Sequence, residues 1–137
     1  MITPPIGLSH QCSIRVDDTL IVPRLPKALA AMADMPPVFA TAYMVAFVEA
    51  TCIEALAPYL EAGEVTVGTH VNISHVAATP VGLVATAQVE LVAAEGRKLI
   101  FRVRCYDETD LIGEGLHERC VVNREQFIFS VEAKSIR

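Results

Sequence analysis

The stretch FATAYMVAFVEATCIEALAPYL, residues 39 to 60, decides the fold, because it is long, rich in alanine and apolar on nearly all sides. Pro36 and Pro37 precede it and Pro58 ends it, so we expect a helix from Val38 to Ala57. A helix that is apolar all round is typical of a buried position. The sequence therefore predicts a core helix that other parts of the protein cover on every side.

The same stretch has the length of a membrane span, which is about 20 residues. Glu49 and Glu54 lie within it, and each would cost about 2 kcal/mol or more near the centre of a bilayer. We therefore expect no membrane partner. The question becomes why a buried helix carries a carboxylate at Glu49.

Composition indicates one globular domain, residues 1–137, because 53% of the residues are hydrophobic and 20% are charged. The net charge is −5 and no segment is strongly basic, so we expect no nucleic-acid partner. The four cysteines form no CxxC pair. Two disulfides are one interpretation, and reduced, mostly buried thiols are the one we favour. The N-terminal residues lack the pattern of a signal peptide, so we expect a cytoplasmic protein.

Five segments read as strands: 11–16, 65–77, 83–93, 98–107 and 111–122. Glu95 and Gly96 predict a hairpin turn between the third and fourth of them. Residues 17–37 contain four prolines and predict a long loop with one short helix, and residues 123–137 form a tail that is helix or strand. Consecutive hairpin-connected strands favour an antiparallel sheet, hence the α+β class, with the sheet curved around the helix and a second copy closing the gap.

Two titratable side chains are expected to meet inside this arrangement. In residues 65–77 the apolar face holds Val65, Val67, Thr69, Val71, Ile73 and His75, so His75 should point at the helix that carries Glu49. Burial raises the pKa of a carboxylate and a nearby imidazole lowers it, so the pair could serve as nucleophile or general base. Thr41 adds a hydroxyl that can hold a water or a substrate oxygen.

Helix geometry separates Thr41 from Glu49 by eight residues, or about 12 Å along the axis. A shared site therefore needs a substrate that spans both or a second subunit that supplies one. Simpler interpretations stay open: His75 as a core histidine, Glu49 paired with Arg102 or Arg104, and Thr41 as a helix cap. His10 and His70 should be solvated, and His117 is ambiguous. His70 and His75 fall on opposite faces of their strand, so no metal site is predicted.

Three segments resemble the fluoroacetyl-CoA thioesterase family of hotdog-fold thioesterases: PPVFATAYMVAFVEATC, VGTHVNISHVAATPVGL and GLHERCVV. With their spacing they cover roughly residues 35 to 125. The resemblance implies a hotdog fold, a curved antiparallel sheet wrapped around one long central helix. It also implies catalytic roles for Thr41, Glu49 and His75.

The same resemblance places Gly68 beside the acyl chain of the substrate, where a side chain would block close approach. It makes Arg119 a candidate for anchoring the carboxylate or the CoA phosphates. Met35 takes the place of an aromatic lid residue, with Met32 one turn earlier. Methionine is flexible, so we expect a different or broader short acyl group.

We therefore expect a homodimer, with a tetramer left open, that hydrolyses a short-chain acyl-CoA to a carboxylic acid and CoA without a cofactor. Amides at the start of the helix would stabilise the oxyanion. Two alternatives remain. A non-catalytic acyl-CoA binding module would release no thiol, and a hotdog enoyl-CoA hydratase usually has a histidine in the central helix, which this helix lacks.

Overall fold

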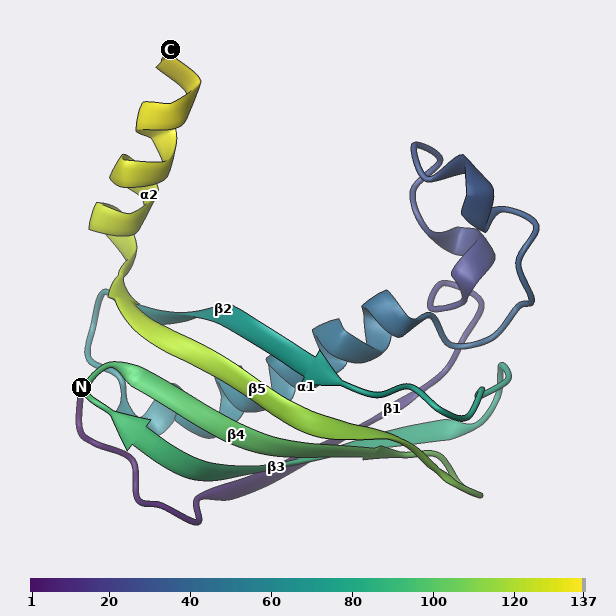
Figure 1. The fold of residues 1–137 in the computed structure, drawn as a ribbon, viewed down its shortest axis with the longest axis horizontal. Coiled ribbons are helices and arrows are strands. Elements are labelled where there is room, and N and C mark those ends of the chain that lie inside the picture. Colours follow the sequence, from purple (N-terminus) through teal and green to yellow (C-terminus); the bar gives the residue numbers. More distant parts are fainter. Residues whose placement is uncertain (137) are drawn as a thin grey trace.

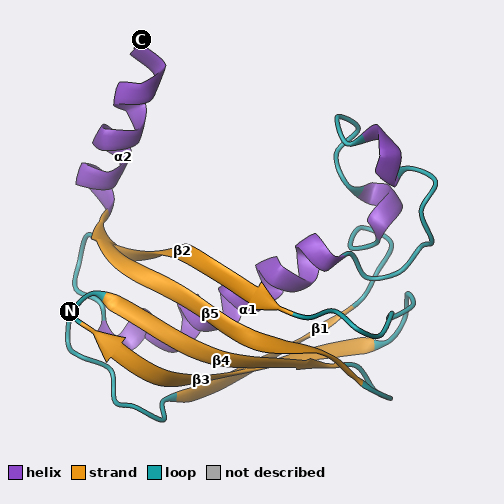
Figure 2. Ribbon diagram, in the orientation of Figure 1, coloured by secondary structure: helices purple, strands orange, loops and turns teal. Residues whose placement is uncertain are grey.

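The computed structural model describes residues 1–136, in which five strands form one curled antiparallel sheet (Figures 1 and 2). Their order across the sheet is β1-β3-β4-β5-β2. The strands are β1 (Ser9–Arg15), β2 (Glu64–Ile73), β3 (Val84–Glu95), β4 (Lys98–Tyr106) and β5 (Leu111–Asn123). The predicted hairpin between β3 and β4 is confirmed, and its Gly96 has the positive φ of 63° that favours glycine. The strands predicted from the sequence are therefore present, with ends that differ by a few residues.

The central helix α1 (Thr41–Leu56) crosses behind the sheet and continues into the 3-10 turn η3 (Ala57–Tyr59) (Figure 1). One side of α1 packs on β1, β3 and β4 and is buried: Met44, Phe47, Val48, Thr51, Cys52, Ala55 and Leu56. The opposite side, which includes Ala42, Ala46, Ala50 and Ile53, is exposed in the single chain. Burial on every side, which the sequence predicted, is therefore not achieved within one copy of the chain.

The stretch Thr41–Tyr59 is also the one part of residues 1–136 that is long and apolar enough to cross a membrane. The core helix of a globular domain meets the same criterion, and seven residues of α1 are buried in the fold. The length of this helix is therefore explained by packing against the sheet.

Strand β2 departs from the regular alternation that the sequence predicted. Its pairing with β5 shifts between Gly68 and His70, so Thr69 is an extra residue that forms a bulge. Before the bulge the residues facing α1 are Thr66 and Gly68, not their apolar neighbours, because they pair with the inward-facing Val121 and Arg119. The predicted faces were therefore wrong for the first half of the strand, and the strand ends at Ile73, before His75.

Two segments stand away from the sheet (Figure 1). The loop before α1 contains two 3-10 turns, η1 (Val22–Arg24) and η2 (Ala30–Met32), where one short helix was predicted. The tail predicted as helix or strand is the helix α2 (Arg124–Glu132), followed by the 3-10 turn η4 (Ala133–Ile136). The loop lies at the N-terminal end of α1, where it borders the start of the helix.

All four cysteines are free. Cys52 and Cys105 are buried, and burial raises their pKa values to about 12 and about 11, so both thiols stay protonated. Cys12 and Cys120 are half-buried. The interpretation as reduced thiols is confirmed, although only two of the four are fully buried.

Candidate functional site

Thr41 and His75 form the first of two polar clusters on α1. Thr41 is the first residue of the helix, and its hydroxyl oxygen lies 2.7 Å from Nδ1 of His75. The N-cap position belongs to Ala40, which makes no side-chain cap, so the interpretation of Thr41 as a cap is wrong. The segment after β2 carries His75 back to the helix, and the ring points at α1 as the sequence predicted.

The imidazole of His75 is half-buried, and burial lowers its pKa below the ordinary value of 6.5. The ring is therefore neutral at pH 7. Its Nε2 is buried and has no hydrogen-bond partner within residues 1–136. Because a buried polar atom is normally paired, this nitrogen is suited to a group that the chain itself does not supply.

Glu49 belongs to the second cluster, two turns further along α1. Its Oε2 accepts a hydrogen bond of 2.8 Å from a terminal nitrogen of Arg119, and the side chain of Glu49 remains 36% exposed. Arg102 and Arg104, the partners considered from sequence, pair instead with Glu90 and Glu114 on the outer side of the sheet. The predicted pairing of Glu49 with an arginine is therefore confirmed, but the partner is Arg119, the residue that the family resemblance named, and neither Arg102 nor Arg104.

Arg119 is 3% exposed and fully engaged inside the protein. Besides Glu49, it donates to the hydroxyl and the carbonyl oxygen of Thr66, at 2.9 and 2.8 Å. With both sides of the guanidinium occupied, the geometry favours anchoring of the carboxylate over binding of CoA phosphates. A buried arginine in this position fixes where Glu49 points.

His117 completes this network. Its Nδ1 lies 2.8 Å from the carbonyl oxygen of His70, and its Nε2 lies 3.1 Å from Arg119. The carbonyl can only accept and the guanidinium can only donate, so the ring is neutral, with its proton on Nδ1. Burial, the largest influence, lowers the pKa of His117, which agrees with a neutral ring.

Gly68 lies directly beside the carboxylate. A Cβ added there would sit 2.7 Å from Oε2 of Glu49 and 3.3 Å from atoms of both Arg119 and His117. Any larger residue would therefore displace the acid from its partner. The close approach of the backbone to Glu49 explains why a glycine stands at this bulged part of β2.

The two clusters do not merge within one chain. Thr41 lies with His75, Glu49 lies with Gly68 and Arg119, and about 12 Å of helix axis separates Thr41 from Glu49. Met35 lies in the loop before α1 and is 48% exposed, three residues beyond Met32. The structure thus brings five of the six candidate residues into two groups on α1, and Met35 lies apart from both in the preceding loop.

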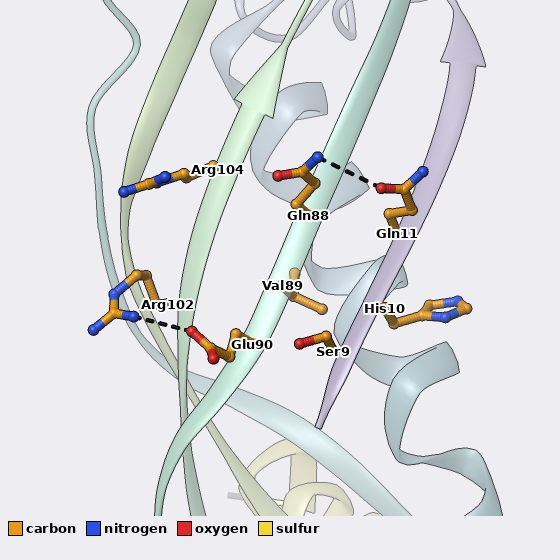
Figure 3. A pocket seen from close by; sticks show the side chains of 8 residues that line it. All are labelled: Ser9, His10, Gln11, Gln88, Val89, Glu90, Arg102 and Arg104. Carbon is orange, nitrogen blue, oxygen red and sulfur yellow. Dashed lines mark hydrogen bonds and ion pairs between the residues drawn. The ribbon is translucent and has the colours of Figure 1, made fainter. Parts of the chain in front are cut away.

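A hollow of about 450 Å³ exists elsewhere, on the outer side of β1, β3 and β4 (Figure 3). Its charged side chains are already paired, as in the 3.0 Å contact between Arg102 and Glu90. His10 points away from the polar side chains of this hollow (Figure 3). None of the candidate residues lines it, so we do not assign the predicted chemistry to this hollow.

Sequence reasoning missed Thr66 and left His117 open, although both hold the arginine that holds Glu49. A signal existed for His117, because it lies two residues before Arg119 and therefore shares its face of β5. No comparable signal existed for Thr66, since the bulge after Gly68 reverses the apparent faces of β2. His10, expected to be solvated, is half-buried on the inner face of β1.

Comparison with known proteins shows which family the chain resembles. The profile of the fluoroacetyl-CoA-specific thioesterase family matches residues 26–125. A fluoroacetyl-CoA thioesterase of Streptantibioticus cattleyicolor is 48% identical over 103 residues, which are 75% of this chain and 74% of that protein. The solved structure of the fluoroacetyl-CoA thioesterase FlK has a TM-score of 0.94 at 40% identity, covering 96% of this chain and 98% of that one.

A threonine-to-serine variant of FlK, solved in complex with acetyl-CoA, has a TM-score of 0.93 at 40% identity, with coverage of 96% and 98%. The curled five-stranded sheet and its single central helix are those of the hotdog thioesterases. The chain belongs to the fluoroacetyl-CoA-specific thioesterase family.

Proposed function

We propose that the protein hydrolyses a short-chain acyl-CoA thioester to a carboxylic acid and free CoA. The observation that carries this proposal is the Glu49 carboxylate, which a buried arginine holds beside the bare backbone of Gly68 while it stays partly open. A carboxylate in a fixed position can attack a thioester carbonyl or activate the water that does. Family membership and the relative solved with acetyl-CoA support the choice of substrate class.

In this proposal Glu49 is the nucleophile or the general base. Arg119 orients its Oε2 and leaves the rest of the carboxylate free to face the substrate. The neutral His117 accepts from the same guanidinium, so the arginine is held from two sides. These groups act by fixing geometry, which contributes to rate when reacting atoms are held in line.

His75 helps to activate the water by taking a proton from it, or, once protonated in this way, it returns that proton to the leaving thiolate. Its Nδ1 is occupied by Thr41, so the unpartnered Nε2 is the nitrogen available for transfer. Thr41 sits at the first turn of α1, where the amides are not capped by the side chain of Ala40. Those amides are suited to stabilising an oxyanion.

We further propose that the working unit is a homodimer with its sites at the interface. The sheet ends at β2, an edge strand on which Val71 is 47% exposed, and the outer side of α1 is apolar and uncovered. A second copy covering both would bring Glu49 of the partner subunit toward Thr41 and His75. The exposed apolar residues of α2 are a second surface through which two dimers could pair into a tetramer.

Met35 and Met32 are both exposed in the loop that precedes α1. We propose that these flexible side chains admit a broader range of short acyl groups than one fluorinated acetyl group.

We also propose that the protein works in the cytoplasm. Its four cysteines are free thiols, which suit a reducing compartment.

Release of free CoA from a panel of acyl-CoA esters, followed with a thiol-reactive dye, tests the proposal. We expect turnover of acetyl-, fluoroacetyl- and propionyl-CoA by the wild type and a loss of turnover in Glu49→Ala with the dimer intact. Binding of the esters without thiol release would indicate a binding module. With an enoyl-CoA ester included in the panel, loss of its absorbance without thiol release would indicate a hydratase, and either outcome overturns the proposed hydrolysis.

A further inference from the structure

Three metal-ligating side chains converge at a place that the thioesterase chemistry does not use. His10 and Cys12 lie two residues apart on the inner face of β1, and Glu54 lies on the C-terminal half of α1. One donor atom from each of the three lies within 4.8 Å of the other two. Residues at positions i and i+2 of a strand share a face, so the strand supplies two donors and the helix supplies the third.

The separations between these donors suit a tetrahedral ion. Nε2 of His10 lies 3.7 Å from Sγ of Cys12 and 4.0 Å from Oε1 of Glu54. Two ligands of a tetrahedral zinc ion lie about 3.3–3.6 Å apart, given its usual bond lengths. Small rotations of the half-buried His10 and the exposed Glu54 would close the difference, because their side chains are 39% and 62% open to solvent.

The third separation is shorter for a clear reason. Sγ of Cys12 donates its proton to Oε2 of Glu54 at 2.8 Å. An ion would take the place of this proton: the S–H bond breaks, the proton passes to the solvent buffer, and sulfur and oxygen both turn to the metal. No oxidant or reductant is needed, since neither the ion nor the sulfur changes its oxidation state.

We propose that His10, Cys12 and Glu54 bind one zinc ion or a similar divalent cation, with water in the fourth position. The donor set of one thiolate, one imidazole and one carboxylate matches the preferences of zinc, whereas magnesium and calcium prefer oxygen ligands alone. The bound ion joins the edge strand β1 to α1. It therefore acts as a clip that stabilises the fold, apart from the site that contains Glu49.

Metal-free protein, prepared with a chelator in a phosphine reductant, is titrated with Co²⁺ and then with Zn²⁺. We expect one Co²⁺ per chain, with a sulfur-to-cobalt charge-transfer band in the near ultraviolet that Zn²⁺ removes. Zn²⁺ should also raise the midpoint of thermal unfolding, because it binds the folded chain in preference to the unfolded one. The matched variants are Cys12→Ser, Glu54→Gln and His10→Gln.

Each of these variants should bind the ion at least about tenfold more weakly, since even residues that only support a ligand contribute that much. Glu54 is exposed, so Glu54→Gln should fold normally. This variant therefore still tests the proposal if Cys12→Ser fails to fold. As controls, Cys120→Ser removes another half-buried thiol and His70→Gln an exposed histidine, and both should bind like the wild type.

Equal affinity in the wild type and in Glu54→Gln, or no charge-transfer band, overturns the proposal. So does a loss of binding in His75→Gln, which would place the ion in the other site. Release of CoA by Glu54→Gln should match that of the wild type. The outcome therefore separates this proposal from the proposed hydrolysis.

Discussion

The two polar clusters on α1 differ in how much of their hydrogen bonding the chain completes by itself. Around Glu49, the buried Arg119 bonds to Thr66, His117 and the carboxylate at once. Around Thr41, a single contact joins the hydroxyl to His75 and leaves Nε2 without a partner in residues 1–136. One cluster is a rigid holder for an acid, and the other is an open pair suited to proton transfer.

This difference suggests a division of labour. A nucleophile gains from a fixed position, because misplacement is costly for rate. A proton-transfer group gains from a free nitrogen near the reacting atoms. The difference also predicts that substitutions in the two clusters will reduce turnover to different extents.

The largest effect is expected for Glu49→Gln. The amide keeps the shape of the side chain and can still accept from Arg119, but it can neither attack a carbonyl nor take a proton. We expect CoA release to fall by about 10²- to 10⁴-fold, with an unchanged circular dichroism spectrum. Glu54→Gln, on the same helix, is the matched control, and turnover close to wild type in Glu49→Gln would remove Glu49 from the mechanism.

A smaller loss, of about 10²-fold, is expected for His75→Gln, because the substrate thiolate can still take a proton from water. Thr41→Ala should cost about tenfold, the value of one neutral hydrogen bond, and Thr41→Ser should restore most of it. Steady-state kcat is the measurement. An unaffected Thr41→Ala together with an inactive Thr41→Ser would contradict a role for the hydroxyl.

Much of this arrangement could be predicted from the sequence, and the reasons are physical. The central helix was evident because it is long, apolar and bracketed by prolines, and its two carboxylates favour a core helix over a membrane span. Glu49 was evident because a carboxylate is out of place in such a helix. Strand alternation pointed His75 at the same helix, and Thr41 lay at its start. The resemblance to the family added Gly68 and Arg119, which the structure places beside Glu49.

What the sequence could not reveal depends on contacts between distant segments. The bulge at Thr69 exchanges the faces of β2 and brings Thr66 inward, an effect that strict alternation cannot predict. The grouping of Cys12 with Glu54 joins residues 42 positions apart, through the packing of β1 on α1. One side of α1 is exposed in the single chain, although the helix is apolar nearly all round.

Gly68→Ala tests the rigid cluster without touching a titratable group. The added Cβ would lie 2.7 Å from Oε2 of Glu49, so the carboxylate must move by a few tenths of an ångström or more. We expect kcat to fall by about 10- to 100-fold, with little change in the thermal unfolding midpoint, because the displaced atom ends a flexible side chain. Ala85→Gly, on β3, is a control for a change of one methyl group.

Met35→Phe tests the loop that precedes α1, next to the N-terminal end of the helix, where Thr41 lies. A rigid aromatic ring should narrow the space that the flexible methionine leaves. We expect the ratio of kcat/KM for fluoroacetyl-CoA over propionyl-CoA to rise by up to about tenfold. Leu29→Phe, in the same exposed loop, is the comparison. An unchanged ratio would show that residue 35 does not determine the acyl selectivity.

The smallest expected effect is on the pH dependence of stability. One histidine from each cluster should cause it. Burial lowers the pKa of both His75 and His117 below their ordinary 6.5. Below pH 6.5 the unfolded chain therefore binds more protons than the folded one. The stability that depends on these neutral rings is fully present above pH 6.5 and is lost as the pH falls through the lowered pKa values.

Urea unfolding between pH 7.5 and pH 5 measures this loss above the range in which carboxylates titrate. We expect the wild type to lose stability over this interval, and His75→Gln and His117→Gln each to lose less. His117 should account for the larger part, because it is fully buried and bonded between a carbonyl and a guanidinium, while His75 is only half-buried. If His75→Gln abolished the dependence and His117→Gln did not, the open pair and not the closed network would be the acid-sensitive part of the fold.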